Sequence, residues 1–318
     1  MEIGLGIDQR LGLSVSQLRE LASDARSLGY QSMWTNSSLD YDPIALCVAW
    51  HGETEMRTGI SVVPIGRAPA EVIGLAARTA HELTAGTFTL GVGAGGVTDK
   101  PIAAVREYIA GVRKVARDVP LIVGALGPQM LRLAGKHARG AALNWCTPEQ
   151  VEWSRAQTGG KALMVDYLRV CVDDDVAAAR RALAQQILAY AMLTRPSGAS
   201  GYRKHFARMG FDEEVANLEA LKAQGESEAE LIRAMPERLL ATFGYAGTGD
   251  GAREWFAKMS RGLDVAIVRL LTPRPGDIAP IRAARPITSA GARPIGTTEM
   301  PVRISVSAFH ATQSAIGS

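Results

Sequence analysis

The chain has 318 residues, of which 47% are hydrophobic, so it is long enough to bury a large core as one α/β barrel or as two domains. Its 35 basic and 32 acidic residues are mixed along the sequence and give a formal net charge of +3, which argues against a nucleic-acid-binding protein. The three cysteines lie far apart and the histidines lack the spacing of metal ligands, so neither a disulfide framework nor a metal site is predicted.

The N-terminus begins directly with a strand-like pattern, Glu2-Ile-Gly-Leu-Gly-Ile7, and shows no basic region followed by an apolar one. No apolar run reaches the roughly 20 residues that a transmembrane helix needs. We therefore expect a cytoplasmic protein that does not bind membranes.

Strand-like and helix-like segments alternate from the first residues onward. The predicted strands are short apolar runs at residues 3–7, 30–34, 57–63, 88–93, 121–123, 140–145, 162–172 and 264–270. The first predicted helix begins at Ser14, where Ser14-Val-Ser-Gln17 forms a capping box. Because strands that alternate with helices form a parallel sheet with right-handed crossovers, these eight steps predict a TIM (β/α)8 barrel over residues 1–286.

Two segments depart from this repeat. Residues 195–235 lie between the seventh and eighth predicted strands and read as helices, which predicts a helical insertion that supplies a lid or an oligomer surface. From residue 287 the chain loses helical periodicity and collects Gly, Pro, Ser and Thr. Residues 287–318 are therefore predicted to be a poorly ordered C-terminal tail.

The segment from Pro120 to Trp145 reads as strand, glycine turn, helix and strand. Gly127 gives a tight turn, and Pro128 suits the first helical position because its missing N–H costs nothing there. The free N–H groups of Gln129 and Met130 then leave a helix N-terminus that attracts phosphate. An ordinary turn between a strand and a helix is the alternative interpretation.

A second glycine cluster, Gly91-Val-Gly-Ala-Gly-Gly96, matches the dinucleotide fingerprint G-x-G-x-x-G. It follows the fourth strand of a continuing series, and the next strand does not end in the acidic residue that would hold a ribose. We interpret these glycines instead as sites of close approach at the carboxyl end of a barrel strand. Either a ligand or the packing of the barrel rim would require them.

Residues 119–145, with the core Ala-Leu-Gly-Pro-x-Met-Leu-x-Leu-Ala-Gly and the closing Leu-Asn-Trp, resemble the signature of the luciferase-like monooxygenase superfamily, in the branch that uses the deazaflavin coenzyme F420. Further matching segments are Thr58–Pro64, Arg67–Pro69, His81–Gly86, Leu90–Gly95, Arg106–Tyr108, Tyr202–Phe206 and Met209–Phe211. The resemblance covers residues 1–285. It implies an oxidoreductase that transfers a hydride between coenzyme F420 and a small organic substrate.

The resemblance also implies where the cofactor binds. Relatives hold the flavin or deazaflavin ring of the cofactor over the carboxyl ends of the strands. A non-proline cis peptide supports this ring, and the corresponding bond here is Ser61–Val62. The residues corresponding to the phosphate turn are Ala125, Leu126, Gly127, Pro128, Gln129 and Met130, and the residues expected to contact the same cofactor side chain are Gly93, Ala94 and Gly95.

The catalytic positions differ from the family pattern. Several relatives carry an Asp–His pair after the second strand, where this chain has Asn36 and Ser37, which do not titrate near neutral pH and would orient substrate. Asp8 ends the first strand on the active face and is the third candidate, with a structural hydrogen bond as its alternative role. Relatives that oxidise sugar phosphates carry a glutamate where this chain has Gly96, which disfavours that substrate class. Residues 96–119 also form a short segment, so the site is expected to be open or to be completed by a second subunit of a homodimer.

Two other functions remain open at this point. An FMN-dependent monooxygenase would need a separate reductase and oxygen. A non-catalytic protein that binds flavin or deazaflavin is favoured by the missing Asp–His pair and the short segment after Gly95. The sequence does not predict the substrate.

Overall fold

The computed structural model describes residues 1–7, 9–193 and 201–276. Asp8 and the predicted tail lie outside the described residues. The predicted domain boundary at residue 286 therefore stays a prediction.

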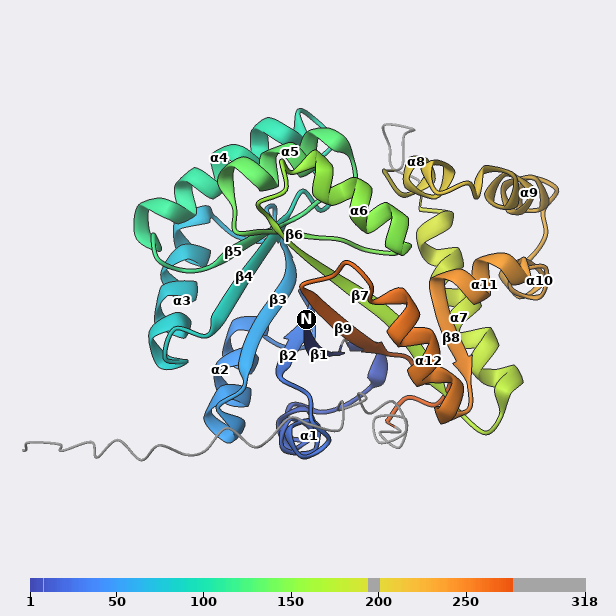
Figure 1. The fold of residues 1–318 in the computed structure, drawn as a ribbon, viewed down its shortest axis with the longest axis horizontal. Helices are drawn as coiled ribbons and strands as arrows, with labels where there is room; N and C mark the ends of the chain where they lie inside the picture. The colour runs from blue at the N-terminus through green and yellow to red at the C-terminus, as the bar shows by residue number, and fades with distance from the viewer. Residues whose placement is uncertain (8, 194–200, 277–318) are drawn as a thin grey trace, which may run out of the picture. The chain divides into compact units, whose positions relative to one another are not determined.

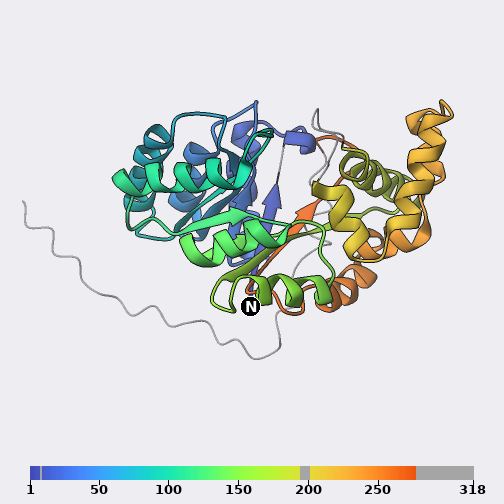
Figure 2. The same cartoon turned by 90° about the horizontal axis from the view of Figure 1, so that it is seen from above.

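The strands of the described residues form a parallel, closed barrel. They are β1 (Glu2–Ile7), β2 (Ser32–Thr35), β3 (Arg57–Pro64), β4 (Phe88–Gly93), β5 (Leu121–Gly124), β6 (Gly140–Ala142), β7 (Leu163–Val172), β8 (Gly244–Gly247) and β9 (Val265–Leu270). Strands β1 to β7 pair in chain order, and β9 closes the ring between β7 and β1 (Figures 1 and 2). The predicted TIM barrel is confirmed.

Helices follow most of the strands and surround the barrel (Figure 1). They are α1 (Val15–Ser27), α2 (Pro43–Thr54), α3 (Ala70–Leu83), α4 (Pro101–Val115), α5 (Pro128–His137), α6 (Pro148–Gln157), α7 (Val176–Ala191), α8 (Gly201–Arg208), α9 (Asp212–Ala223), α10 (Glu228–Arg233), α11 (Glu237–Phe243) and α12 (Gly249–Met259), with the short 3-10 turn η1 (Gln9–Leu11). The predicted capping box at Ser14 is present, because its side chain accepts from the Gln17 N–H while the Gln17 side chain accepts from the Ser14 N–H.

The helical insertion lies between β7 and β9, the seventh and eighth strands of the barrel (Figure 1). Helices α8 to α10 fall within the predicted residues 195–235, and the insertion continues beyond them through α11. It has its own apolar core with α7, which includes Phe206, Phe211, Leu218 and Phe243. Strand β8 was not predicted, because Gly244-Tyr-Ala-Gly247 is short and carries little apolar surface. It pairs only with the carboxyl end of β7 and lies outside the ring of the barrel.

Two large aromatic rings fill the barrel interior opposite glycines. Side chains from five strands pack there: Trp34, Ile122, Ala142, Val165, Tyr167 and Ile267. A Cβ atom on Gly59 would lie 2.4 Å from the Trp34 ring, and one on Gly6 would lie 2.7 Å from the Tyr167 ring. The Tyr167 hydroxyl donates to the Thr35 carbonyl at 3.0 Å, which links β7 to β2 across the interior. The barrel is therefore a packed core rather than a pore.

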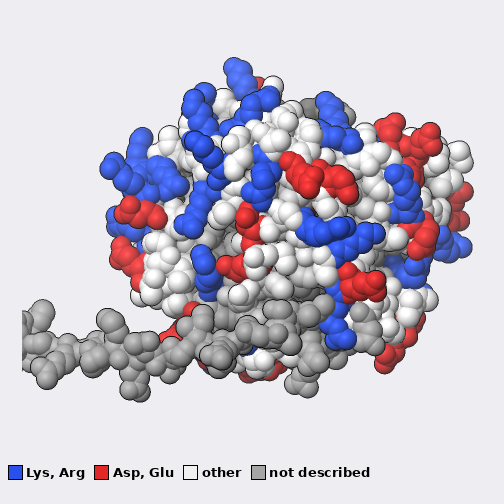
Figure 3. All heavy atoms as spheres, viewed as in Figure 1, with Lys and Arg blue, Asp and Glu red and all other residues white. Residues whose placement is uncertain are grey.

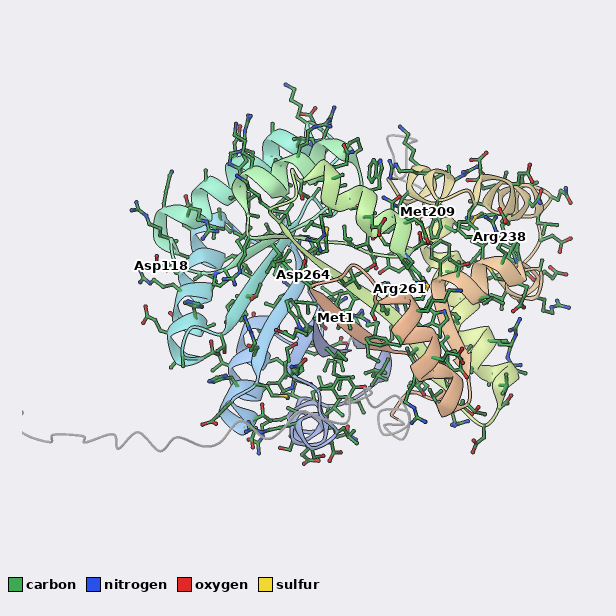
Figure 4. The ribbon with its side chains drawn as sticks, viewed as in Figure 1. Met1, Asp118, Met209, Arg238, Arg261 and Asp264 are labelled. Carbon is green, nitrogen blue, oxygen red and sulfur yellow. The ribbon has the colours of Figure 1, made fainter. Side chains whose placement is uncertain are left out.

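The amino-terminal ends of the strands are closed by hydrogen bonds around Asp264, the residue before β9 (Figure 4). Its carboxylate accepts from the Met164 N–H at 2.7 Å and from the Arg155 guanidinium at 2.8 Å, and its backbone carbonyl accepts from the Glu2 N–H. This end is a structural face. The opposite end, where the strands finish, is the one that builds active sites in this fold.

Positive and negative side chains are interspersed on the face shown in Figure 3, in agreement with the mixed charge of the sequence. Among the helices of the described ranges, none has the length and apolar character needed to cross a membrane.

Candidate active site

The rim of the barrel mouth is built by the residues that continue the inward-facing alternation of the strands. Each of these rim residues follows, two positions later in the sequence, a side chain that fills the barrel interior. They are Asn36 after β2, Gly124 in β5, Asn144 after β6, Arg169 in β7 and Arg269 in β9. All of them lie toward the carboxyl ends of the strands, which is where ligands bind in TIM barrels.

Strand β3 carries the expected cis peptide. The bond between Ser61 and Val62 is cis, and the pairing of β3 with β4 shifts register between Ile60 and Val63. Both residues of the bond are half-buried. The cofactor contacts of Ser61 and Val62 stay predictions.

The glycines after the fourth strand are explained by their packing against β3. A Cβ atom on Gly91 would lie 2.1 Å from the Ile60 carbonyl oxygen, one on Gly93 would lie 2.7 Å from the Val62 side chain, and one on Gly95 would lie 2.6 Å from Pro64. The spacing of these glycines thus follows every second residue of β3. Packing of the rim accounts for them, and ligand contacts of Gly93, Ala94 and Gly95 remain to be tested.

The Gly127 turn has the geometry of an anion site. Gly127 is the extended N-cap of α5 (φ −100°, ψ 159°), and Pro128 is the first helical residue. A Cβ atom on Gly127 would have no heavy-atom neighbour within 4 Å, so the space beside it is open. The first-turn N–H groups of Gln129 and Met130 have no acceptor within their own helix.

A cation from the insertion reaches this turn. The Arg208 guanidinium on α8 donates to the carbonyl of Leu126 at 3.1 Å and stacks on the Trp153 ring at 4.5 Å. It forms no ion pair with any described residue, and burial lowers its pKa. The sequence did not predict this residue, since it lies 81 positions beyond Gly127 in a helix of otherwise ordinary polarity.

Asn36 follows β2 directly, with Ser37 behind it, and both are half-buried. The Asn36 side-chain oxygen is buried and accepts no hydrogen bond from the described residues. Buried acceptors without a donor are costly, and most native ones have a protein, water or ligand partner. Asn36 therefore offers a free acceptor at the mouth, whereas Asp8, the third predicted candidate, lies outside the described residues.

The sixth predicted strand was drawn too long. Strand β6 ends at Ala142, and the chain after it cannot continue as a strand to Trp145, whose backbone is left-handed (φ 60°). The Asn144 amide group donates to the Tyr202 hydroxyl at 2.7 Å, while its side-chain oxygen is buried without a donor among the described residues. Like Asn36, it presents an unused amide oxygen near the mouth.

His205 on α8 fastens this loop to the insertion. Its Nε2 lies 3.0 Å from both the Asn144 and Trp145 carbonyl oxygens, so it is the protonated nitrogen and donates to them. Burial lowers the pKa of the ring to about 4, which keeps it neutral. His205 therefore has a structural role here.

Two arginines complete the rim and were missed by the sequence analysis. Arg169 and Arg269 are paired in register on β7 and β9 and are 4% and 5% exposed. The Arg169 guanidinium lies 3.7 Å from the Trp145 ring centroid, and Arg269 lies over the Tyr167 ring at 4.7 Å. Arg269 is the single charged residue of β9, and β7 carries Arg169 together with Asp166 among apolar residues. Charged residues inside such strands are a signal that sequence reading offers, because Arg is almost never fully buried without a partner.

Asp166 is a buried carboxyl on the helix-facing side of β7. Its Oδ2 accepts from the Cys146 N–H at 3.2 Å. Burial raises its pKa to about 7, although Arg169 and the hydrogen bonds oppose the shift. No cluster of His, Cys, Asp and Glu suited to a metal ion occurs among the described residues.

The fold and this mouth define a TIM barrel with a candidate ligand site at the carboxyl ends of its strands. Residues 3–264 match the model of the family described as luciferase-like monooxygenase. The chain therefore belongs to the luciferase-like monooxygenase family and is an oxidoreductase.

Known proteins of similar sequence and structure include F420-dependent enzymes. The 5,10-methylenetetrahydromethanopterin reductase of Methanolobus tindarius is 23% identical over 306 residues, which cover 82% of this chain and 91% of that protein. The coenzyme F420 dependent tetrahydromethanopterin reductase from Methanopyrus kandleri superposes with a TM-score of 0.68 at 17% identity, covering 85% of this chain and 93% of the other. An F420-dependent secondary alcohol dehydrogenase in complex with an F420-acetone adduct superposes with a TM-score of 0.62 at 14% identity, covering 89% and 96%. At these identities the superpositions establish the fold.

Proposed function

We propose that this protein binds coenzyme F420 at the mouth of its barrel and transfers a hydride between the deazaflavin ring and a small organic substrate. The observation that carries the proposal is the open N-terminus of α5 at Gly127 with the guanidinium of Arg208 beside it, which forms no ion pair with a described residue. The F420-dependent relatives support the choice of this cofactor.

The α5 turn fits a phosphate group. The N–H groups of Gln129 and Met130 and the positive end of the helix dipole attract an anion, and Arg208 adds a full charge. Nothing in the protein fills the space beside Gly127, so a phosphate can approach the backbone closely.

The two unused amide oxygens fit the ring. Flavin and deazaflavin rings carry a pyrimidinedione N–H, and the buried oxygens of Asn36 and Asn144 are acceptors without donors among the described residues. Val62 and Gly93 would lie behind the ring on the β3 and β4 side, as the family resemblance implies.

In the proposed reaction the protein orients and shields, while the bound deazaflavin supplies the carbon that accepts or donates the hydride. Asn36 holds substrate or ring by its amide, and Trp34 and Tyr167 form the floor that excludes water from below. The described side chains at the mouth are amides, hydroxyls and guanidinium groups, so substrate orientation, rather than a carboxylate base, is the contribution of these residues.

Binding of F420 tests the proposal. Titration of the purified protein with F420 should shift the deazaflavin absorbance and quench its fluorescence, and Arg208→Met should weaken the affinity by about tenfold because a charge-assisted contact is lost. Arg117→Met, which removes an exposed arginine far from the mouth, is the matched control.

Parallel titration with FMN separates the alternative cofactor, whose phosphate would fit the same turn. Tighter binding of FMN than of F420, or no binding of either, would overturn the proposal. Binding of F420 without turnover of a panel of alcohols, aldehydes and imines would favour the non-catalytic function instead.

A further inference from the structure

We propose that a basic cavity between the helices outside the barrel binds the carboxylate-bearing end of the coenzyme F420 side chain, and so selects F420 over FMN. This assignment of the cavity rests on the proposed function. The side chain of F420 continues beyond its phosphate into a lactyl group and a chain of linked glutamates, whereas that of FMN ends at the phosphate. A site for the glutamates therefore distinguishes two cofactors whose phosphates fit the same turn.

The cavity has a volume of about 610 Å³. Its walls come from the start of α6, the end of α8, and helices α11 and α12, and Met209, Arg238 and Arg261 lie around it (Figure 4). The rings of Trp153 and Trp255 also line it, and both are half-buried. The cavity is thus a hollow with aromatic walls that is open to charged groups at its edge.

Positive charge dominates the walls of the cavity. The charged wall residues are one carboxylate, that of Glu149, and four cations, which are Arg208, Arg238, Lys258 and Arg261. Arg238 forms an ion pair with Glu214, which is not a wall residue. The other three cations form no ion pair with a described residue. Their side chains are exposed, so a ligand can reach the charged groups from solvent.

The carboxylate of Glu149 does not neutralise this charge. Hydrogen bonds from its own N–H and from the Thr147 hydroxyl lower its pKa, and Arg261 and Lys258 lower it further. One carboxylate that is already hydrogen-bonded at the start of α6 thus faces several cations. The remaining positive charge lies in a hollow, where walls of low dielectric constant focus the field and attract anions.

Arg208 joins the cavity to the α5 turn. Its guanidinium carbon lies 4.5 Å from the centroid of the Trp153 ring, a wall of the cavity, and its Nη1 donates to the Leu126 carbonyl at 3.1 Å. Leu126 precedes Gly127, where the phosphate of the cofactor is proposed to bind. A cofactor side chain that continues beyond this phosphate therefore reaches the cavity by passing one arginine.

The unpaired cations lie toward opposite ends of the barrel wall. Arg208 contacts the loop after the carboxyl end of β5, whereas Arg261 lies three positions before Asp264, at the amino-terminal ends of the strands. Lys258 is in the last turn of α12, and its carbonyl accepts from the Arg261 Nε at 3.1 Å. A single phosphate or carboxylate would contact one end of this series. A chain of carboxylates can contact its members in succession, as the glutamates of F420 would.

The affinities of two forms of the cofactor test this site. The form without glutamates, F420-0, should bind through its ring and phosphate alone. A form with several glutamates should bind the wild type about tenfold more tightly at low ionic strength, measured by quenching of the deazaflavin fluorescence. This gain should fall to about twofold in about 0.5 M salt, because interactions between exposed charges are screened.

Variants of the cavity separate the glutamates from the phosphate. The double change Lys258→Met with Arg261→Met should reduce the gain from the glutamates to about twofold or less, and should leave the affinity for F420-0 within about twofold. The double change Lys114→Met with Arg117→Met removes the same charge from exposed residues at the end of α4 and should keep the full gain. All four residues are exposed, so both proteins should fold.

The outcomes are distinct. Equal affinity of the wild type for the two forms would overturn the site, as would a gain that survives in the cavity variant or one that is lost equally in the α4 variant. Binding of F420-0 without a gain from the glutamates would refute the cavity and leave the proposed function intact. Failure of both forms to bind would refute the proposed function itself.

Discussion

At the scale of single residues, the mouth of the barrel contains polar groups that the fold itself does not use. The side-chain oxygens of Asn36 and Asn144 are buried without a donor among the described residues, and the guanidinium of Arg169 is buried with a single described acceptor. Unused polar groups reduce stability, and they concentrate where a ligand completes their hydrogen bonds. These residues are therefore the ones in which changes should affect function more than folding.

The amide of Asn36 is expected to orient substrate. Asn36→Ala should lower turnover by about tenfold or more, because a misplaced substrate reacts slowly, while F420 affinity changes little. Asn36→Asp should introduce a titrating group into the pH profile of kcat, since a carboxylate replaces an amide that does not ionise. Steady-state kinetics and an F420 titration check both effects, with Ser37→Ala for comparison. If both Asn36 variants behave as the wild type does, the loop that contains Asn36 has only a structural role.

The raised pKa of Asp166 should make the stability of the folded protein depend on pH. The folded protein binds the Asp166 proton up to about pH 7, whereas the unfolded chain releases it near pH 4, so ionisation of this carboxyl costs stability as the pH rises through that window. Asp166→Asn keeps an oxygen acceptor for the Cys146 N–H. It should match the wild type at pH 4 and be more stable at pH 8.

Urea unfolding across pH 4–8 measures this difference in the free energy of unfolding. The exposed Asp118, at the edge of the barrel (Figure 4), provides the control variant Asp118→Asn, which should show no such trend. A stability difference between Asp166→Asn and wild type that is the same at both ends of the range would contradict the assignment of the shift to Asp166.

At the scale of elements, the first turn of α5 and the insertion act on the same site. Helix α5 presents its N-terminus at Gly127, α8 brings Arg208 to it, and His205 of α8 holds the loop after β6. The Arg169 guanidinium carbon lies over the Tyr190 ring of α7, 5.6 Å from its centroid. The insertion therefore contributes to one side of the mouth, and its expected role as a lid or as an oligomer surface stays a prediction.

The α5 turn should bind phosphate through its backbone. Gly127→Val should weaken F420 affinity by about an order of magnitude, because the added side chain would occupy the open space beside the turn. The fold should be unaffected, since Gly127 has an extended backbone that Val adopts easily and its Cβ would meet no neighbour. Gly52→Val adds the same side chain at a glycine of α2 that also has no neighbour. Unchanged affinity in a folded Gly127→Val protein would argue against the phosphate site.

At the scale of the whole molecule, helix α3 leaves apolar side chains uncovered. Val72, Leu75 and Leu83 are 55%, 46% and 62% exposed and lie on one face of the helix. The sequence analysis predicts a homodimer, and we expect this face of α3 to form its interface. Light scattering after size exclusion should give the mass of a dimer, and the double change Val72→Asp with Leu75→Asp should give a monomer, because burying two carboxylates in an interface is costly.

Val15→Asp places the same charge on an equally exposed apolar residue at the start of α1, where an acid suits the helix dipole, so it should remain dimeric. A monomeric wild type at micromolar concentration would refute the dimer. A dimeric α3 variant would place the interface elsewhere on the molecule.

The elements of this protein follow from local patterns in its sequence. Apolar runs, the cap at Ser14 and the prolines at the starts of helices specify the barrel strands within a few residues, and the Gly127-Pro128 turn marks a helix N-terminus without reference to the rest of the chain. These features are local because backbone hydrogen bonding and capping involve residues close in sequence. They were sufficient to predict the fold and the helix N-terminus at Gly127.

Only the tertiary structure decided which side chains meet at the mouth. Arg169 and Arg269 become neighbours because β9 pairs with β7, and Arg208 reaches Leu126 because the insertion folds back over the barrel. The spacing of Gly91 and Gly93, which resembles a nucleotide fingerprint, is set by the packing of β3 instead. Strand order and register join positions that are far apart in sequence, so a local pattern has no means of encoding these contacts, and the unused donors and acceptors at the mouth become visible only when the barrel closes.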